Sequence, residues 1–594
     1  MQKVNELNPI YNVLKTEWAF LGKRKKIFLF YITLFVISGT LGLLNPLIIG
    51  FIFNSIQQNI SSPEELNHLI FMIFLLLFVQ IVMWLFHGPA RIMEQMTAFH
   101  VHRNYTNSKI KKVLGLPIKW QKDHHSGDTI DKINRAREGL YDFSESLTMT
   151  IIYAMLNIFG SLLVLFFVDF KIAIFSLVFS LIILWITITF DKRIVQCYKE
   201  VNIFSNKLSA SIFDYLSNIF TVVTLRLKKT VEKEIDYRLS ASYDVEKRKA
   251  FLLEAKWGFA SIAIVFMTVL VLSYKAYVDY YSTGVILIGT LYLLYSYLNR
   301  VGNTFFNFAN IYTKIAKYDS KIYGAYPIDE AYDLVDNRIE GKLPVDWNEI
   351  SLKNLSFTYD DDGKKLHIDN VNINFKRGQK IALIGESGSG KSTILSLMRG
   401  LYFPDKGNVY VNGLEINGGI QKLKRHITLI PQEPEIFNNT IGFNITMDLN
   451  VKKSDLQKAI NMAQFGDVVR RLRDGLDTNV LEKGVSLSGG EKQRLALARG
   501  LLAAKGSDIV LFDEPTSSVD SLNEMKIHDN IFREFKGKTI ISSIHRLHLL
   551  DKFDYIYMFD HGKIIAEGSL NEIKKNPRFK QIWDKYGVEK NNLS

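Results

Sequence analysis

Six long apolar runs fill the first half of the chain, and polar segments of very different length separate them. The runs cover about residues 26–54, 68–90, 143–168, 172–190, 256–277 and 285–311. Several exceed about 18 apolar residues, the length at which a helix can cross the hydrocarbon core of a bilayer. We therefore predict six transmembrane helices rather than a soluble protein with buried helices. Pro46 lies inside the first run and is expected to kink that helix.

Two of the polar segments are too long to be simple loops, and their composition is compatible with helices. They lie between the second and third runs and between the fourth and fifth, and both are rich in Lys and Arg. Positively charged segments stay on the cytosolic side of a membrane, so we expect both segments and both termini in the cytosol. We predict helical extensions that turn at tips near residues 125–133 and 209–217.

Charge and cysteine content narrow the class of protein further. The 594 residues include 73 Lys and Arg against 60 Asp and Glu, a net charge of +13. Basic clusters flank the apolar runs, as at residues 23–26, so contact with membrane lipids explains the charge better than binding to nucleic acid. The single cysteine, Cys197, excludes an intrachain disulfide. The polar N-terminus is not typical of a cleavable signal peptide.

The second half of the chain has the pattern of a soluble domain. Short apolar or alternating stretches predict strands at about residues 350–358, 371–375, 409–411, 427–430, 509–512, 539–543 and 555–559. Helical segments alternate with them, which indicates an α/β core. We place a transmembrane domain at residues 1–325, a linker at 326–346, the α/β domain at 347–585 and a C-terminal tail at 586–594.

The stretch IALIGESGSGKST, at residues 381–393, carries the clearest chemistry. Four apolar residues predict a buried strand, and a glycine-rich loop and the start of a helix follow: Gly385, Glu386, Ser387, Gly388, Ser389, Gly390, Lys391, Ser392 and Thr393. Glycines let backbone N–H groups wrap phosphate oxygens, and the positive end of the helix strengthens the attraction. We predict that Lys391 reaches the β- and γ-phosphates of a nucleotide and that Ser392 holds Mg²⁺.

Two adjacent carboxylates end another buried strand, in the stretch DIVLFDE at residues 508–514. Asp513 suits coordination of Mg²⁺, usually through water. Glu514 suits the positioning and polarisation of the attacking water. Because adjacent residues of a strand point in opposite directions, the two carboxylates can serve these two roles separately.

A second anion site is predicted in VSLSGGEKQR, at residues 485–494, where Ser488, Gly489 and Gly490 open a helix. One nucleotide does not need two such sites in the same chain. We therefore expect Ser488 and Gly490 to face the γ-phosphate of a nucleotide that is bound to a partner subunit.

Taken together, the motifs GESGSGKST, LSGGEKQR and IVLFDEP resemble those of the ATP-binding cassette exporters, and the resemblance covers nearly the whole chain. It implies a half-transporter, in which a helical transmembrane domain with six spans and long cytosolic extensions is fused to an α/β P-loop ATPase domain. It also implies that Tyr359 stacks on adenine and that Gln432 contacts Mg²⁺ and couples to the membrane domain. By the same resemblance, His545 contacts the γ-phosphate, and Asp520 communicates between two ATP sites.

Three positions depart from the family pattern. Glu491 stands in the signature where glutamine is commoner, and Ser518 and Val519 replace the usual Ala-Leu pair before the aspartate. Leu481 stands where glycine is usual, although the neighbouring Glu482 is present. These changes bear on communication between the sites and on coupling, while the residues for ATP hydrolysis are all present.

We predict a primary-active exporter, an ATPase that moves a hydrophobic or amphipathic substrate out of the cytosol or across the bilayer. Lipids, drugs and peptides all stay open as substrates, and an ATP-gated channel or regulator on the same fold is the alternative. We expect ATP and Mg²⁺ as cofactors, a second copy of the chain as the partner, with a heterodimer as the other option, and a bacterial inner membrane as the location.

The sequence also offers candidates for substrate contact and for coupling. Tyr292, Tyr295 and Asn299 share one face of the sixth run, where they either line a cavity or pack between helices. Lys275 is either a cation of the cavity or a side chain that reaches the interface. The family resemblance implies that the tip near residues 209–217 docks on the partner's cassette, close to Gln432.

Overall fold

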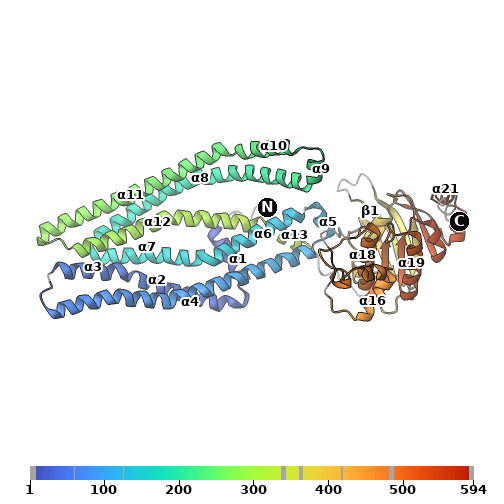
Figure 1. Cartoon of the computed structure of the whole chain (residues 1–594), viewed down its shortest axis with the longest axis horizontal. Coiled ribbons are helices and arrows are strands. Elements are labelled where there is room, and N and C mark those ends of the chain that lie inside the picture. Colours follow the sequence, from blue (N-terminus) through green and yellow to red (C-terminus); the bar gives the residue numbers. More distant parts are fainter. Residues whose placement is uncertain are drawn as a thin grey trace. The chain divides into compact units, whose positions relative to one another are not determined.

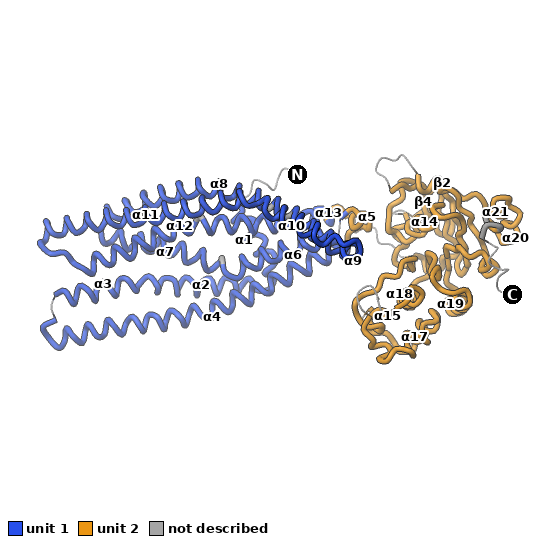
Figure 2. Tube along the Cα trace, turned by 45° about the horizontal axis from the view of Figure 1, so that its top comes forward, with its two compact units in different colours: residues 1–115, 124–332 blue, residues 116–123, 333–594 orange. Residues whose placement is uncertain are grey.

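The computed structural model of the protein describes residues 8–58, 60–124, 126–335, 343–359, 366–416, 419–447, 449–480 and 487–586. Its internal contacts divide the chain into two compact units, coloured separately in Figure 2. The first contains residues 1–115 and 124–332, and the second contains residues 116–123 and 333–594. The predicted combination of a helical domain followed by an α/β domain is confirmed.

Helices are the only regular elements among the described residues of the first unit, and Figure 1 shows the long helices running side by side. The elements are α1 (Pro9–Phe20), η1 (Gly22–Arg24), α2 (Lys25–Gly42), α3 (Leu44–Gln57), α4 (Pro63–Gly115), α6 (Ser126–Asp142), the π-helical turn η2 (Phe143–Leu147), α7 (Thr148–Val168), α8 (Phe170–Ser217), α9 (Ile219–Thr224), α10 (Lys228–Ser240), α11 (Tyr243–Thr283), α12 (Ile288–Tyr323) and α13 (Tyr326–Asp333). The helix α13 lies in the stretch that the sequence suggests as a linker.

Five helical segments of the described chain are long and apolar enough to cross a membrane: Gly22–Gln57, Pro63–Gly115, Thr148–Val168, Phe170–Ser217 and Lys228–Thr283. The sixth predicted span corresponds to α12, which is long enough but more polar, because tyrosines and asparagines interrupt its apolar residues. Length and composition therefore support five of the six predicted spans individually.

The first span is broken near Pro46, as its sequence predicts. α2 ends at Gly42 and α3 begins at Leu44, because Pro46 has no N–H and its ring crowds the carbonyl of Gly42. In a membrane, the carbonyls freed by such a break need other donors. Tyr297 Oη donates to the Leu43 carbonyl at 2.5 Å, and Arg300 Nη1 donates to the Gly42 carbonyl at 3.2 Å. Both donors come from α12, which thereby fixes the position of the break.

The two polar segments are helical extensions, as predicted, but their tips lie elsewhere. α4 is continuous over 53 residues, and the first tip is the short helix α5 (Ile118–Asp123), which follows the break at Pro117. α8 continues to Ser217, so residues 209–217 are its last turns, and the second tip is α9. The predicted tips near 125–133 and 209–217 were therefore wrong by several residues. Asn218 ends α8, and its side chain donates to the Asp214 carbonyl at 2.9 Å.

The second unit is built on two larger sheets. The antiparallel sheet has the order β2-β1-β4-β5, and the main sheet has the order β12-β11-β3-β10-β9-β6. Their strands are β1 (Glu349–Phe357), β2 (Ile368–Lys376), β3 (Lys380–Ile384), β4 (Lys406–Val411), β5 (Leu414–Glu415), β6 (Ile427–Ile430), β9 (Ile509–Asp513), β10 (Thr539–Ser543), β11 (Tyr555–Asp560) and β12 (Lys563–Gly568); a short pair, β7 (Asn439–Thr440) and β8 (Asn479–Val480), lies apart. In the main sheet β3 pairs in parallel with both β10 and β11, so the predicted glycine loop leaves a central strand.

Helices cover the sheets of the second unit, and apolar side chains fill the space between them. The helices are α14 (Lys391–Met398), η3 (Gly419–His426), α15 (Ile441–Thr446), α16 (Lys453–Met462), α17 (Gly466–Arg471), η4 (Gly475–Asp477), α18 (Gly489–Ala503), η6 (Ala504–Gly506), α19 (Ser521–Glu534), η7 (Leu547–Lys552), α20 (Leu570–Ile573) and α21 (Pro577–Tyr586). Parallel strands place their carboxyl ends at one edge of a sheet, which is where ligands bind in such folds.

Candidate nucleotide-binding site

The glycine loop leaves β3 and ends where α14 begins at Lys391, as the sequence predicts. Gly385 has φ +147°, and a Cβ atom there would lie 2.2 Å from the carbonyl oxygen of Phe559, so only glycine fits. The Ser389 N–H donates to the Glu386 carbonyl, and the Ser389 carbonyl accepts from the Gly562 N–H. These bonds tie the loop to its own first residues and to the turn between β11 and β12.

Lys391 is buried inside this loop. Its Nζ donates to the carbonyl oxygens of Gly385 at 2.8 Å and Glu386 at 3.0 Å. Burial lowers the pKa of Lys391, while the negative charges of Glu514 and Asp513 oppose the shift. The hydroxyl of Ser389 is also buried and has no hydrogen-bond partner among the described residues. A buried ammonium group beside an unpaired hydroxyl group fits an anionic ligand in the loop.

Asp513 lies where the sequence predicts, at the end of β9 and next to the start of α14. The hydroxyl groups of Ser392 and Ser543 each donate to its Oδ1 at 2.9 Å. Burial raises the pKa of Asp513, against the opposing effect of these two hydrogen bonds. A partly buried carboxylate beside a serine hydroxyl provides the hard oxygen ligands that Mg²⁺ prefers. The residues present therefore fit a Mg²⁺ ion.

Glu514 is the centre of a polar cluster at the same edge of the sheet. Its Oε1 lies 2.6 Å from Nε2 of His545, and its Oε2 accepts from Nε2 of Gln432 at 2.8 Å. Gln432 follows β6 and His545 follows β10, so three strands bring these residues together. Glu514 has φ +46°, a conformation that costs a non-glycine residue about 1–3 kcal/mol and that is found most often at functional sites.

A cavity of about 180 Å³ lies beside this carboxylate and is lined by Glu514, Thr516, Glu524, Ser543, His545 and Arg546, among others. Glu524 is buried, accepts from Thr516 Oγ1 at 2.7 Å and from Arg546 Nη1 at 2.8 Å, and so fixes the loop that follows Glu514. The cavity leaves room next to Glu514 for a water molecule and for part of a ligand.

Tyr359 follows β1 and is partly exposed. Its ring centroid lies 4.9 Å from that of His367 and 5.1 Å from that of Tyr402, and its hydroxyl lies 3.4 Å from Thr393 Oγ1. The packing holds the ring near the first turn of α14 while part of it faces solvent. This position suits the predicted stacking on a base bound next to the glycine loop.

The signature motif begins α18 and forms a capping box. Glu491 N–H donates to Ser488 Oγ, and Glu491 Oε2 accepts from the Ser488 N–H at 2.9 Å. Burial acts to raise the pKa of Glu491, but the hydrogen bonds from Ser488 and Arg471 outweigh it and lower the pKa. Glu491, which departs from the family pattern, therefore stabilises the start of α18. Ser488 and Gly489 are exposed to solvent.

A buried glutamine that sequence reasoning missed connects the signature helix to the carboxylates. Gln493 Nε2 donates to Ser517 Oγ at 2.9 Å and to the Glu514 carbonyl at 3.3 Å, and its Oε1 accepts from the Ser518 N–H at 2.7 Å. A Cβ atom on Gly490 would lie 2.8 Å from the carbonyl oxygen of Ser518, so glycine allows this close approach. In the sequence, only the position of Gln493 inside the signature motif could have indicated this role, because the hydrogen-bond partners of Gln493 are more than 20 residues away.

The structure also shows the positions of Asp520 and of the neighbouring residues that depart from the family pattern. Asp520 is the N-cap of α19, where it accepts from the N–H and the side-chain amide of Asn523, and these bonds lower its pKa. Val519 is buried, whereas Ser518 is exposed. Leu481 and Glu482 lie outside the described residues.

Comparison with known proteins decides the family. The family model described as the ABC transporter transmembrane region matches residues 28–303, and the model described as ABC transporter matches residues 368–517. The chain belongs to the ABC transporters. Lys391, the signature residues 485–494 and Glu514 all lie within the matched residues 368–517.

Curated relatives match this ABC transporter over most of its length. A Rickettsia typhi protein provisionally named export ATP-binding/permease protein is 26% identical over 565 residues, which cover 93% of this chain and 95% of the relative. The ATP-dependent lipid A-core flippase of Vibrio vulnificus is 26% identical over 79% of this chain and 80% of its own. The ATM1-type heavy metal exporter of Novosphingobium aromaticivorans is 26% identical over 86% of this chain and 84% of its own.

A solved structure has the same fold. A bacterial Atm1-family ABC exporter with ATP bound matches with a TM-score of 0.81 at 22% identity, over 95% of this chain and 99% of the other. The family and these relatives show that the chain is a multi-pass membrane protein and an exporter. Its cassette binds ATP and couples ATP hydrolysis to transport.

Proposed function

We propose that two copies of this chain form the working exporter and that each ATP lies between the glycine loop of one copy and the signature of the other. The observation that carries the proposal is the exposed start of α18. Ser488 presents its hydroxyl group and Gly489 its backbone N–H group to solvent at the positive end of that helix. The hydrogen bonds of Gln493 position this end beside Ser517 and Ser518 of its own chain. A second chain is therefore a natural source of the phosphate.

One chain carries every residue that two equivalent sites require, which favours a symmetric pair of copies over a heterodimer. Lys391, the loop amides from Gly385 to Gly390 and the helix start at Ser392 bind the phosphates, and Tyr359 contacts the base. Ser392, Asp513 and Gln432 would hold Mg²⁺, which when bound neutralises charge on the β- and γ-phosphates. Asp520, close to the signature, connects the two sites.

Glu514 is the general base of the proposed mechanism. Its carboxylate accepts a proton from the water that attacks the γ-phosphate, and the N–H groups of the loop stabilise the developing charge. His545 Nε2, 2.6 Å from Glu514 Oε1, orients this carboxylate and contacts the γ-phosphate. Gln432 holds the other carboxylate oxygen, so a change at Gln432 is transmitted directly to the base.

Coupling to the membrane domain is assigned to the two helical tips. In the second unit, Ile118 of α5 packs against the cassette core, and Lys122 Nζ lies 5.5 Å from the ring centroid of Tyr402, next to Tyr359. The second tip, α9, exposes apolar side chains, including Phe220, which is 82% exposed. We assign α9 to docking on the partner's cassette, so that closure of the cassettes moves helices of both chains.

The proposed substrate is hydrophobic or amphipathic, as the apolar walls of the spans suggest, and lipids, drugs and peptides are the classes to test. Tyr295 is the exposed member of the predicted polar face, while the Tyr292 ring packs on Phe53 at 5.2 Å between centroids. Lys275 forms an ion pair with Asp279 at 2.8 Å, so the charge of Lys275 is already balanced. We propose that the cassette and both termini lie in the cytosol, which the basic extensions favour. The proposed membrane is a bacterial inner membrane.

The test is an ATPase screen of the purified chain in nanodiscs against a phospholipid, a lipophilic drug and a peptide, combined with planar-bilayer recording. An exporter shows ATPase activity stimulated by one class, ATP-dependent movement of that class into vesicles, and no unitary current. ATP-dependent unitary currents without accumulation would instead identify an ATP-gated channel and overturn the proposal.

A further inference from the structure

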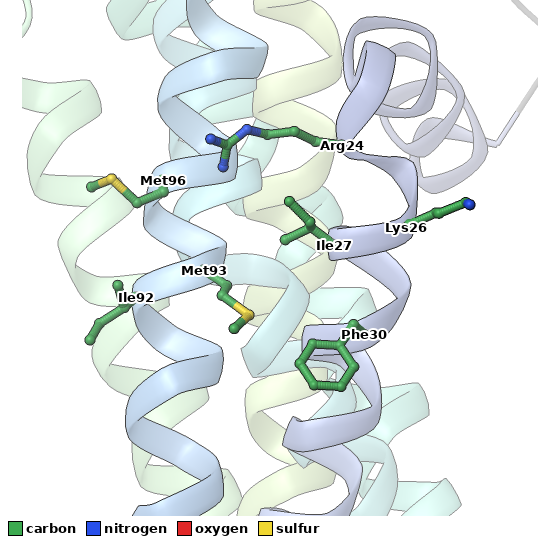
Figure 3. Close-up of a pocket in the computed structure, with 7 residues that line it drawn as sticks. All are labelled: Arg24, Lys26, Ile27, Phe30, Ile92, Met93 and Met96. Carbon is green, nitrogen blue, oxygen red and sulfur yellow. The ribbon is translucent and has the colours of Figure 1, made fainter.

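A hollow of about 370 Å³ opens between the first two membrane helices, at the end where α2 begins, and Figure 3 shows its lining. Ile27 and Phe30 of α2 and Ile92, Met93 and Met96 of α4 form its apolar walls, and Arg24 and Lys26 lie at its polar end. Phe30, Ile92 and Met96 are each more than half exposed. In a membrane protein, such exposed apolar side chains face lipid rather than water.

Two features place the hollow at the surface of the membrane. The basic residues 23–26 precede the apolar residues of α2, where positive charge marks the cytosolic interface. Trp18 is exposed nearby, with Lys25 Nζ 4.8 Å from its ring centroid, and tryptophan is enriched at this depth. The apolar part of the hollow therefore lies at the level of the acyl chains and Arg24 at the level of the headgroups.

The polar end of the hollow is positively charged in the described part of the chain. In Figure 3 the Arg24 guanidinium extends toward α4, whereas Lys26 points away from the hollow. No carboxylate lies within ion-pair distance of Arg24 among the described residues. On α4, His100 lies within electrostatic range of both Arg24 and Arg103, so a second arginine lies near Arg24. By contrast, Arg91, which is also on α4, is paired with the buried Glu94.

We propose that this hollow binds one anionic phospholipid of the cytosolic leaflet. The phosphate accepts hydrogen bonds from the Arg24 guanidinium, which matches phosphate oxygens in a bidentate manner, and one acyl chain lies against Phe30, Ile92 and Met93. The unbalanced positive charge selects an anionic over a zwitterionic headgroup. The open walls admit a long flexible acyl chain, and the site differs from the ATP site and from the predicted polar face of α12 that includes Tyr295.

A fluorophore inside the hollow tests the proposal on the full chain. Cys197 is the only cysteine, so Cys197→Ser combined with Met96→Cys allows one bimane label on the wall of the hollow. The protein is reconstituted in phosphatidylcholine vesicles that contain either brominated phosphatidylglycerol or brominated phosphatidylcholine at the same mole fraction. We expect at least twofold stronger quenching by phosphatidylglycerol. A label at Phe78→Cys, exposed farther along α4, should be quenched equally by both lipids.

Variants of the basic residues 23–26 show whether Arg24 causes the preference for the anionic lipid. Arg24→Gln should remove the preference, Arg24→Lys should retain most of it, and Lys23→Gln, in the same run but outside the hollow, should leave it unchanged. Millimolar glycerol phosphate should not reverse the quenching, because a free phosphate gains nothing from the apolar walls. Equal quenching by both lipids at Met96, an unchanged preference in Arg24→Gln, or displacement by glycerol phosphate would each overturn the proposal.

Discussion

Nε2 of His545 lies 2.6 Å from Oε1 of Glu514, and this contact joins the ends of two neighbouring parallel strands beside the cavity that both residues line. The contact fixes one carboxylate oxygen, while Gln432 fixes the other. A carboxylate held at both oxygens has a defined direction, which is what a base that orients a water molecule requires.

Glu514→Gln should therefore lower ATP turnover by about 100-fold or more, the usual contribution of a general base, and leave ATP binding intact. The amide keeps the size of the side chain and its contacts but cannot accept the proton. Phosphate release by the purified variant, next to Glu534→Gln in an exposed part of α19, measures the effect. Turnover near that of the wild type would refute the role of Glu514.

Lys391→Ala should weaken ATP binding by roughly tenfold to a hundredfold, because a hydrogen bond from a charged group contributes about 1.5–3 kcal/mol. In the structure the ammonium group is held by the carbonyls of Gly385 and Glu386, directly within the loop. Titration with a fluorescent ATP analogue gives the affinity, and Lys376→Ala, at the exposed end of β2, is the control. An affinity equal to that of the control would contradict the phosphate-loop assignment.

Motifs with local causes could be predicted from the sequence, whereas contacts between distant residues could not. The glycine loop, the strand before it and the break near Pro46 follow from the conformational limits of glycine and proline. Nothing in the sequence near Pro46 indicates that Tyr297 and Arg300, about 250 residues later, supply the missing donors. Gln493 was missed for the same reason.

The tips of the helical extensions show where periodicity gives too little information. Polar residues of the extensions fit a helix almost everywhere, so the pattern does not show where a helix ends. Asn218 ends α8 through its backbone and side-chain bonds to Asp214, and such a residue also occurs inside helices. The prediction near 209–217 therefore stopped one turn early.

The placement of α9 determines where a cross-link between two chains is expected. In a Cys197→Ser background, Phe220→Cys combined with Glu435→Cys should form a disulfide between chains, because Phe220 is exposed on the tip that we assign to the partner's cassette. Locking this bond should stop transport. Differently tagged copies separated on a non-reducing gel reveal whether two chains are joined. Tyr237→Cys, exposed on α10, replaces Phe220→Cys in the control. Cross-links found only within one chain would refute the docking of α9 on the partner's cassette.

Stability should depend on pH through Glu17, which is buried on α1. Burial raises its pKa from 4.5 to about 7, with the charge of Glu94 adding to the shift and Ser144 opposing it. The folded protein therefore binds this proton more tightly than the unfolded chain, and the stability from it is complete below pH 4.5 and lost as pH rises through 7. The loss amounts to at most about 3 kcal/mol.

Glu17→Gln should flatten this dependence, because an amide stays neutral at every pH. The midpoint of thermal unfolding between pH 5 and pH 8, followed by tryptophan fluorescence in nanodiscs, measures it. Glu64→Gln, at the exposed start of α4, should keep the dependence of the wild type. If the variants at Glu17 and Glu64 lose stability equally as the pH rises, the buried carboxyl group of Glu17 is not the cause.

The central claim is that two copies of this chain enclose two ATP molecules and that Glu514 is the general base for their hydrolysis. Native mass spectrometry of Glu514→Gln after incubation with ATP and Mg²⁺ tests it most directly. We predict one species with the mass of two chains and two ATP molecules, which is absent when Lys391→Ala is combined with Glu514→Gln. A single chain with ATP, a complex that requires a different second chain, or a dimer that holds no ATP would contradict the account.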